Sequence, residues 1–314
     1  MRKEERYARQ LLLPEIGAAG QERLSRAHAL LVGVGGLGCP IAQYLVGAGI
    51  GRLTLVDDDV VSVSNLHRQI LYDESQVGEP KALMAQRRLS LLNSEVKVEA
   101  HVCRLTPENA ESLAAGCDVL IDGCDNFATR FLLDDVSERM GIPYFYGAVR
   151  GFEGQVAVFG LGETPLRYRD LHPDREATLK MPHPGKQVVG MTPAVVGSVL
   201  ATQVVQYVCG HSPSLAGRLW TINLLTMESA AFEWGVPRGS RIHPKKAVRQ
   251  IINFDTPPSL CWDLQQNLCQ NALKRERRKK CEISFAREAR VFTFQTYTFF
   301  KGTCIPSKSY TVRA

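Results

Sequence analysis

The residues best suited to chemistry gather between Asp57 and Lys81. Asn65, Arg68 and Gln69 follow the acid Asp57, and Lys81 opens a predicted helix. A lysine and an arginine held near a nucleotide suit a triphosphate, because the departing pyrophosphate develops negative charge. A nicotinamide cofactor has two phosphates and no leaving group, so a dehydrogenase needs no such pair. Taken singly, Arg68 and Lys81 have a simpler interpretation as two surface cations.

A glycine-rich turn precedes this segment and lies between an apolar run and a helix-compatible stretch. The run covers residues 29–32, and the next apolar run ends in Asp57, 24 residues after Gly33. The turn contains four glycines: Gly33, Gly35, Gly36 and Gly38. Such a turn lets backbone N–H groups approach phosphates at a helix N-terminus, and an acid at this distance accepts from ribose hydroxyls. The alternative is a glycine turn used only for helix–sheet packing.

A second acid follows the fourth predicted strand. The strand covers residues 118–122, and Asp125 and Asn126 come just after it. Ligands of open α/β sheets bind at the carboxyl ends of strands, where an Asp facing a triphosphate is a natural Mg²⁺ ligand. The alternative role is an N-cap for the helix from Phe127, and the two roles can be split between Asp125 and Asn126.

Strand and helix patterns alternate through most of the chain. The predicted strands are 29–34, 52–56, 96–102, 118–122, 143–149, 154–159, 219–223 and 228–234. The predicted helices are 36–49, 80–92, 107–115, 127–140 and 193–208, and residues 161–191 are predicted to form a long loop. This order predicts an α/β fold with a Rossmann-like doubly wound sheet. The sheet is mostly parallel, with antiparallel strands at its C-terminal end and helices on both faces.

Charge separates the end of the chain from the rest. The 314 residues have a net charge of +6, but residues 235–314 alone carry 16 Lys and Arg against 5 Asp and Glu. We predict two parts, a nucleotide-binding α/β domain over 1–234 and a basic tail over 235–314 that is disordered or irregular. The run 274–280 could bind nucleic acid, but a solvated extension with no specific nucleic-acid partner is expected.

Membrane and export signals are not evident in the sequence. No run of 18 apolar residues occurs, and the first residues form no apolar signal segment. The nine cysteines show no regular framework. We therefore expect a cytoplasmic protein with reduced thiols and no membrane partner.

The combined motifs resemble the ThiF/MoeB/HesA family, whose adenylation domain is shared by ubiquitin-activating enzymes. The resemblance covers about residues 5–234. It rests on motifs in the family's order: Arg6-Tyr-x-Arg9-Gln10, the Gly33–Gly38 loop, Asp57-x-Asp59, Asn65-Leu-x-Arg68-Gln69, Lys81, Asp125-Asn126, Gly151-Phe-Glu-Gly154-Gln155-Val-x-Val-Phe159 and Thr192-Pro193-x-Val-Val-Gly197.

The resemblance implies an activity. Family members adenylate the C-terminal Gly-Gly carboxylate of a small ubiquitin-like sulfur carrier with ATP and release pyrophosphate. By resemblance, Asp57 binds the ribose, while Asn65, Arg68 and Lys81 bind the phosphates. Asp125 serves Mg²⁺ and the reaction centre. The remaining expected nucleotide-binding residues are Gly33, Gly35, Gly36, Gly38, Asp59, Gln69 and Asn126. Arg9 is expected to reach the phosphates of the neighbouring subunit in a homodimer.

Two departures from the family pattern matter. Relatives commonly hold a structural zinc with two Cys-x-x-Cys pairs, and this chain has none. We predict no zinc, since His172 and His183 are too few for a tetrahedral site. Residues 161–191 also lack the cysteine with which some relatives form a covalent link to the carrier. Cys39 and Cys124 lie near the expected nucleotide but next to glycines, where packing is the favoured role.

The resemblance therefore implies a homodimeric adenylyltransferase that activates a sulfur carrier. The sequence does not specify the carrier, and the overall resemblance favours one of thiamine biosynthesis. A molybdopterin-synthase carrier is the alternative substrate. Two other classes stay open: a NAD-dependent oxidoreductase, and a catalytically silent scaffold that binds ATP and a carrier.

Overall fold

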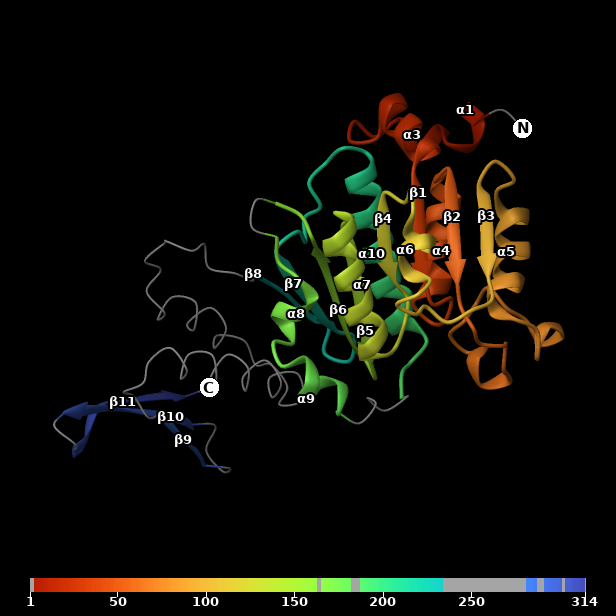
Figure 1. The fold of residues 1–314 in the computed structure, drawn as a ribbon. Helices are drawn as coiled ribbons and strands as arrows, with labels where there is room; N and C mark the ends of the chain where they lie inside the picture. The colour runs from red at the N-terminus through yellow and green to blue at the C-terminus, as the bar shows by residue number, and fades with distance from the viewer. Residues whose placement is uncertain are drawn as a thin grey trace. The chain divides into compact units, whose positions relative to one another are not determined.

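The computed structural model describes residues 3–162, 165–181, 187–233, 281–286, 291–300 and 303–313 (Figure 1). The chain divides into two compact units, Met1–Ser240 and Arg241–Ala314. The first unit contains every residue that the sequence predicts for the site.

The first unit is built on an eight-stranded sheet with the order β3-β2-β1-β4-β5-β6-β7-β8. Its strands are β1 (His28–Val32), β2 (Arg52–Val56), β3 (Lys97–His101), β4 (Val119–Asp122), β5 (Tyr144–Arg150), β6 (Glu153–Phe159), β7 (Arg218–Asn223) and β8 (Glu228–Glu233). The first five strands are parallel, and β6, β7 and β8 are added antiparallel. This confirms the predicted fold class.

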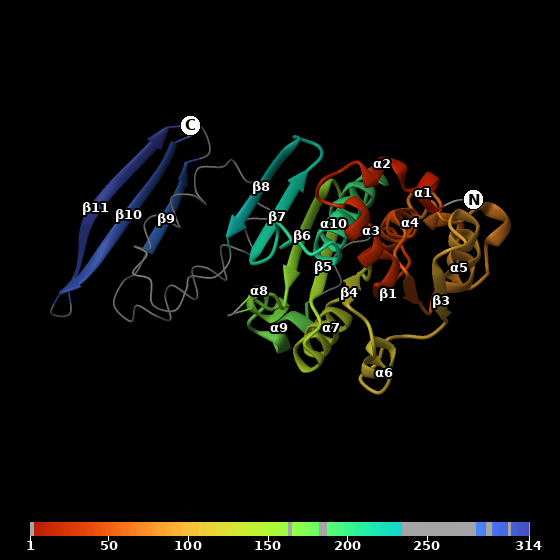
Figure 2. The same ribbon diagram turned by 90° about the horizontal axis from the view of Figure 1, so that it is seen from above.

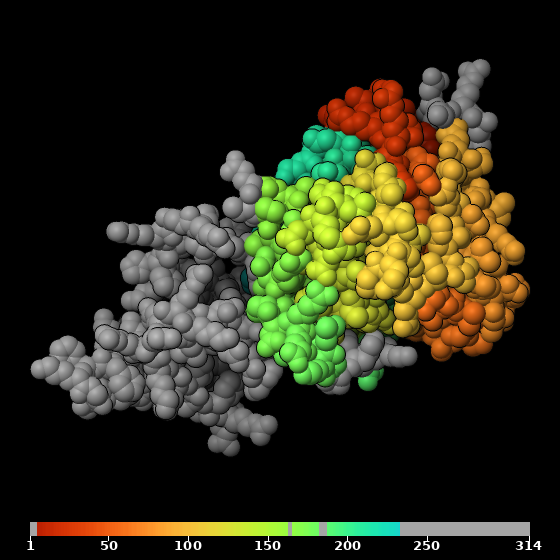
Figure 3. Space-filling view, viewed as in Figure 1, coloured from red at the N-terminus to blue at the C-terminus, as the bar shows by residue number. Residues whose placement is uncertain are grey.

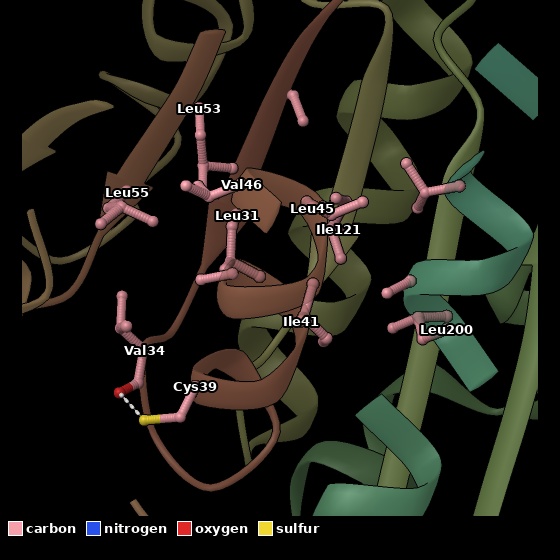
Figure 4. Close-up of a cluster of buried hydrophobic side chains, with 14 of the residues drawn as sticks. Leu31, Val34, Cys39, Ile41, Leu45, Val46, Leu53, Leu55, Ile121 and Leu200 are labelled. Carbon is pink, nitrogen blue, oxygen red and sulfur yellow. Dashed lines mark hydrogen bonds between the residues drawn. The ribbon is translucent and has the colours of Figure 1, made fainter. Parts of the chain in front are cut away.

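Helices cover both faces of the sheet, as the alternation of buried side chains requires. Leu31 and Ile121 face one apolar layer, while Leu30 and Leu120 face the other. The first layer is covered by α4 (Gly38–Ala48), α5 (Lys81–Leu92) and α10 (Met191–Val208). The second is covered by α6 (Ala110–Ala114), α7 (Phe127–Met140) and α8 (Tyr168–Leu171). Figure 2 shows the two groups on opposite sides of the sheet, and Figure 4 shows Leu31 and Ile121 beside Ile41 and Leu45 of α4.

Three short helices form an N-terminal arm before the first strand. They are α1 (Lys3–Arg6), α2 (Ala8–Leu11) and α3 (Gly17–Arg26). Gln10 Nε2 donates to the carbonyl of Ala48, the last residue of α4, across 2.8 Å. The Tyr7 hydroxyl accepts from Asn93 Nδ2 across 2.8 Å. The arm is therefore fixed at the end of the sheet where the parallel strands begin (Figure 1).

Residues 161–191 contain more structure than the predicted long loop. Besides α8, the segment forms α9 (Arg175–Leu179), capped by the Asp174 carboxylate, which accepts from the amide of Ala177. Tyr168 and Leu171 are buried in the second apolar layer. The helices form because α7 provides a surface on which these side chains pack, and a composition-based prediction does not include that surface.

The helix α10 is long and apolar enough to cross a membrane by length and composition, with a mean hydropathy of 1.2. Half of it is buried inside the protein. Val196, Leu200 and Val204 are fully buried against the first face of the sheet. Its packing is that of a core helix.

The second unit contains a three-stranded antiparallel sheet. Its strands are β9 (Cys281–Ala286), β10 (Val291–Phe300) and β11 (Thr303–Arg313), in the order β11-β10-β9. These strands were not predicted from the sequence, since residues 235–314 show no sustained alternation of strand and helix patterns. The boundary predicted after residue 234 falls within 234–280, which lies outside the described residues and stays a prediction.

Candidate active site

The carboxyl ends of β1 and β4 meet at two glycines, Gly33 and Gly123. Gly33 has φ +88°, and a Cβ built on it would lie 2.7 Å from the Gly123 carbonyl carbon. A Cβ on Gly123 would lie 2.2 Å from the Gly33 carbonyl oxygen. No side chain fits at either position. This contact is the point where the strand order reverses, which is where open α/β sheets bind their ligands.

The glycine loop continues from this contact into α4. A Cβ on Gly38 would lie 2.1 Å from the Gly33 carbonyl oxygen, so the first turn of α4 packs directly on the end of β1. Gly35 and Gly36 face two predicted site residues. Their added Cβ atoms would lie 3.6 Å from Gln69 Nε2 and 3.4 Å from Arg68 Cδ, respectively. The structure thus brings the loop, Arg68 and Gln69 together.

Asp57, which follows β2, is hydrogen-bonded to the same loop. Its Oδ2 accepts a hydrogen bond from the Val34 amide across 2.7 Å, and its Oδ1 accepts from the Asp59 amide across 2.8 Å. Burial raises the pKa of Asp57, against the lowering effect of these two amides and of the Lys81 charge. The acid therefore lies where a ribose acceptor is expected, beside the first turn of the phosphate loop.

Lys81 and Asp59 form an ion pair at the start of α5. Lys81 Nζ lies 2.8 Å from Asp59 Oδ2, and the Lys81 amide donates to the Asp59 carbonyl across 3.0 Å. The lysine side chain is 6% exposed, whereas that of Asp59 is 72% exposed. The pair thus joins a buried cation to a carboxylate at the surface of the site.

Asn65, Arg68 and Gln69 lie on one turn that starts with the 3₁₀ helix η1 (Val63–Asn65). The Asn65 carbonyl accepts from the amides of Arg68 and Gln69 across 3.0 and 2.9 Å. Gln69 is buried, and its Oε1 has no hydrogen-bond partner within the described part of the chain. A buried acceptor without a partner is uncommon in folded proteins and suits a ligand donor at this position.

Asp125 and Asn126 take different places at the end of β4. Asn126 Oδ1 accepts from the Thr129 amide across 2.9 Å and so caps α7. Asp125 is exposed at the edge of the sheet that carries the glycine loop. The cap that the sequence assigned to either residue is therefore formed by Asn126.

A buried ion pair next to Asp125 was missed by sequence reasoning. Arg130 Nε lies 3.1 Å from Asp122 Oδ2, with both side chains buried. Asp122 Oδ1 accepts from the Cys124 amide across 2.9 Å, and Arg130 Nη2 donates to the Cys124 carbonyl across 3.1 Å. The ion pair therefore bonds both the amide and the carbonyl of Cys124, the residue that precedes Asp125. In the sequence, this pair is indicated only by an acid at the end of an apolar strand and an arginine eight residues later.

Tyr72 was also missed. Its hydroxyl donates to the Val34 carbonyl across 2.8 Å and is buried beneath the glycine loop. Together with Asp57, it fixes both polar groups of the Val34 backbone. Residue type alone gave no signal for this role.

The thiols near the loop are buried, in line with the predicted packing role. Cys39 and Cys124 are both buried. Burial raises the pKa of Cys39 to about 12 and raises that of Cys124 well above its ordinary value. Neither thiol forms the thiolate that nucleophilic attack requires at neutral pH.

The described residues contain no group of three or more His, Cys, Asp or Glu placed to hold a metal ion. His172 packs among aromatic rings, with its centroid 5.0 Å from that of Tyr168, and burial lowers its pKa to about 4. His183 lies outside the described residues. The absence of zinc stays a prediction.

Arg9, unlike Asp57, Arg68 and Gln69, lies away from the glycine loop. It is exposed on α2. The arm is anchored at Ala48, at the far end of α4. An eleven-residue helix spans about 16 Å, so the arm and the loop are separated by roughly that distance within one chain.

Comparisons with known proteins agree with this geometry. The ThiF family model matches residues 7–240. A sulfur carrier protein adenylyltransferase of Thermus thermophilus is 48% identical over 226 residues, which cover 68% of this chain and 81% of the relative. A probable adenylyltransferase/sulfurtransferase, MoeZ of Mycobacterium tuberculosis, is 40% identical over 229 residues, 71% of this chain and 58% of that protein. The chain thus spans little more than half the length of MoeZ.

A structural comparison shows the same fold. E. coli MccB with ATP has a TM-score of 0.64 at 20% identity, and the match covers 74% of this chain and 72% of MccB. The named relatives are adenylyltransferases, which removes the oxidoreductase alternative. This chain belongs to the ThiF family and is an adenylyltransferase.

Proposed function

We propose that this protein uses ATP to adenylate the C-terminal carboxylate of a small ubiquitin-like sulfur carrier ending in Gly-Gly. The observation that carries the proposal is the Gly33–Gly38 loop, fastened to Asp57 and flanked by Arg68 and Gln69 where β1 and β4 meet. The Thermus thermophilus relative, which is named as acting on a sulfur carrier, supports the choice of substrate.

The site residues suggest how ATP binds. Asp57 lies beside the first loop turn and would accept from ribose hydroxyls, as such acids do in nucleotide-binding folds. The loop amides and the N-terminus of α4 would face the phosphates. Arg68, whose stem passes over Gly36, would place its guanidinium near the same phosphates.

The reaction needs no protein base. The carrier's terminal carboxylate is already ionised at neutral pH and attacks the α-phosphorus in line. A bond forms between a carboxylate oxygen and the α-phosphorus, while the bond to the bridging oxygen breaks and its electron pair leaves with pyrophosphate. Arg68 and Lys81 would stabilise the charge that develops on that leaving group. Lys81 would exchange its contact with Asp59 for the phosphates.

The exposed carboxylate of Asp125 fits a magnesium ion, because Mg²⁺ in ATP sites usually takes one or two carboxylates together with phosphate oxygens. Bound Mg²⁺ would neutralise part of the phosphate charge. The Asp122–Arg130 pair would hold Asp125 in place through the Cys124 backbone.

Arg9 supports a homodimeric site. Its arm is anchored about one helix length from the loop of its own chain. A second copy that places its arm over this loop would supply the third cation for the triphosphate. The dimer would then be part of the active site.

Two carrier types remain as candidates for the substrate. The thiamine-type carrier is proposed on overall resemblance to the family. A relative supports the molybdopterin-type carrier as the alternative. It is a probable molybdopterin-synthase adenylyltransferase of Porphyra purpurea, 33% identical over 276 residues, which cover 86% of this chain and 72% of the relative. Offering both purified carriers to the enzyme in competition would identify the preferred one.

ATP–pyrophosphate exchange tests the proposal. Labelled pyrophosphate should enter ATP only when Mg²⁺ and a carrier ending in Gly-Gly are both present. The same carrier with its two last glycines removed is the matched control. ATP binding without exchange with either carrier type would instead identify a silent scaffold.

A further inference from the structure

Tyr72 lies where three segments of the candidate site meet: the turn that carries Gln69, the glycine loop and the start of α5. Its amide donates to the Gln69 carbonyl across 3.2 Å, and its ring belongs to the first apolar layer. The chain around it forms part of the molecular surface, orange in Figure 3, whereas Tyr72 itself is only 6% exposed. Its side chain is therefore buried beneath the site.

The Tyr72 hydroxyl contacts one carbonyl in each of two segments. It lies 2.8 Å from the Val34 carbonyl oxygen in the glycine loop and 3.4 Å from that of Lys81, the first residue of α5. Burial raises the pKa of Tyr72, so the hydroxyl keeps its proton and acts as a donor. Because it has one proton, the shorter contact is the main hydrogen bond and the longer one is the weaker branch of a three-centre bond. A single oxygen atom thus joins the loop to the lysine helix.

The Val34 carbonyl depends on this donor. Cys39 Sγ also donates to it, across 3.5 Å along the dashed line in Figure 4, but a thiol is a weak donor. Without the Tyr72 hydroxyl, this buried carbonyl would keep only the weak donor, which is costly. Glycines flank Val34 on both sides and restrict the backbone little, so the peptide would be free to turn.

Lys81 is attached to Asp59 as well as to Tyr72. The Lys81 amide donates to the Asp59 carbonyl across 3.0 Å, and Lys81 Nζ lies 2.8 Å from Asp59 Oδ2. These two contacts attach the start of α5 to the segment after β2. The Tyr72 hydroxyl adds a direct attachment to the glycine loop. The loop and the lysine, which are both expected to face one triphosphate, are thus held by the same side chain.

From these contacts we infer that Tyr72 is a positioning residue for the triphosphate. Its hydroxyl fixes the Val34 peptide, and with it the direction of the loop amides, relative to Lys81. The hydroxyl lies beneath the loop and acts through it, without touching ATP or the carrier. The inference rests on the proposed function, because it concerns the placement of phosphates for adenylation.

The test compares Tyr72→Phe with Tyr146→Phe. Tyr146 is a matched control in the apolar layer on the opposite face of the sheet, since it is 3% exposed and its hydroxyl donates to Gln155 Oε1 across 3.4 Å. Each change removes one buried hydroxyl and keeps the ring. Titration calorimetry measures the affinity for a non-hydrolysable ATP analogue. Competition with that analogue measures the affinity for adenosine, which has the ribose but no phosphate.

Tyr72→Phe should weaken binding of the ATP analogue at least about fivefold, because the Val34 carbonyl loses its main donor and the loop amides lose their fixed direction. Adenosine affinity should change by less than about twofold, since Asp57 keeps its hydrogen bond from the Asp59 amide. Pyrophosphate exchange should show a kcat lowered about tenfold with an unchanged carrier KM, because misplaced phosphates slow the in-line attack. Tyr146→Phe should bind both ligands as the wild type does.

Equal analogue affinities for the two variants, or an equal loss of analogue and adenosine affinity in Tyr72→Phe, would overturn the inference. A lower melting temperature of Tyr72→Phe with an unchanged ratio of the two affinities would show that the hydroxyl only stabilises the fold. Wild-type enzyme that binds the analogue but shows no pyrophosphate exchange with either carrier type would refute the proposed function. The ratio of affinities would still test the role of Tyr72 in that case.

Discussion

The Val34 amide donates a hydrogen bond to Asp57 Oδ2 across 2.7 Å, so the acid after β2 is fastened to the first turn of the glycine loop. The other oxygen of Asp57 accepts from the Asp59 amide across 2.8 Å. One carboxylate therefore both shapes the loop and stands at the expected ribose position. Tyr72 holds the carbonyl of the same Val34 residue from beneath.

Asp57→Ala should weaken binding of a non-hydrolysable ATP analogue by at least about tenfold, because hydrogen bonds to a charged acceptor are each worth about 1.5–3 kcal/mol. Titration calorimetry measures the effect. Asp58→Ala is the control, since Asp58 pairs at the surface with Arg104 across 3.2 Å. Equal affinities for the two variants would remove Asp57 from the nucleotide site.

Asp125→Ala should reduce pyrophosphate exchange more than about a hundredfold while leaving the melting temperature unchanged, because a lost reaction-centre carboxylate costs at least about 3 kcal/mol. Asn126→Ala should instead lower the free energy of unfolding by about 1 kcal/mol, since the Thr129 amide loses its cap. Near-normal exchange by Asp125→Ala would refute the assignment of Asp125.

Arg9→Ala and Lys81→Ala should each be inactive alone and partly active when mixed. A mixed dimer contains one site that receives a normal Arg9 from the partner and keeps its own Lys81. Subunit exchange is first confirmed by native mass spectrometry with one variant tagged. If activity does not return after exchange, Arg9 acts within its own chain or has no part in the reaction.

His172 should make the fold sensitive to acid. Its folded-state pKa is lowered from 6.5 to about 4 by burial and by the nearby Arg130. Between these values the unfolded chain binds a proton that the folded chain rejects, so stability is full above pH 6.5 and falls as the pH drops towards 4. The loss is at most about 3 kcal/mol, at 1.36 kcal/mol for each pKa unit.

Urea denaturation at several pH values checks this effect. His172→Phe should unfold with a weaker pH dependence over that range, because no imidazole must stay neutral in the aromatic cluster. His211→Gln, a change at an exposed histidine, should follow the wild type. Parallel curves for His172→Phe and the wild type would show that another group causes the acid sensitivity.

The sequence predicted the elements that depend on local order. The Gly33–Gly38 loop is a contiguous strand, turn and helix, so its spacing alone indicated where Asp57 would come. The eight strands of the first unit followed from apolar runs and their separations. The antiparallel end also followed, because a short hairpin joins β7 to β8.

What the sequence did not reveal depends on contacts between distant segments. The Arg130–Asp122 pair forms only when α7 packs against the sheet. The hydrogen bond from the backbone of α8 to Asp134 forms only when α8 packs against α7. Residues 161–191 were predicted to form a loop because their composition does not reveal that α8 and α9 pack against α7. The role of Tyr72 depends on the loop folding above it. Arg9 was assigned by resemblance, and its distance from the loop of its own chain leaves the trans contact as a prediction.

Intact-mass measurement of the carrier tests the central claim most directly. Enzyme, ATP, Mg²⁺ and a carrier ending in Gly-Gly are mixed with inorganic pyrophosphatase, and the carrier is analysed within minutes. Adenylation predicts that the carrier gains the mass of one adenylyl group, placed on its last glycine by fragmentation, and that Asp125→Ala gives no such species. An unmodified carrier, under conditions where wild-type enzyme binds both ATP and the carrier, would contradict adenylation of the Gly-Gly carboxylate.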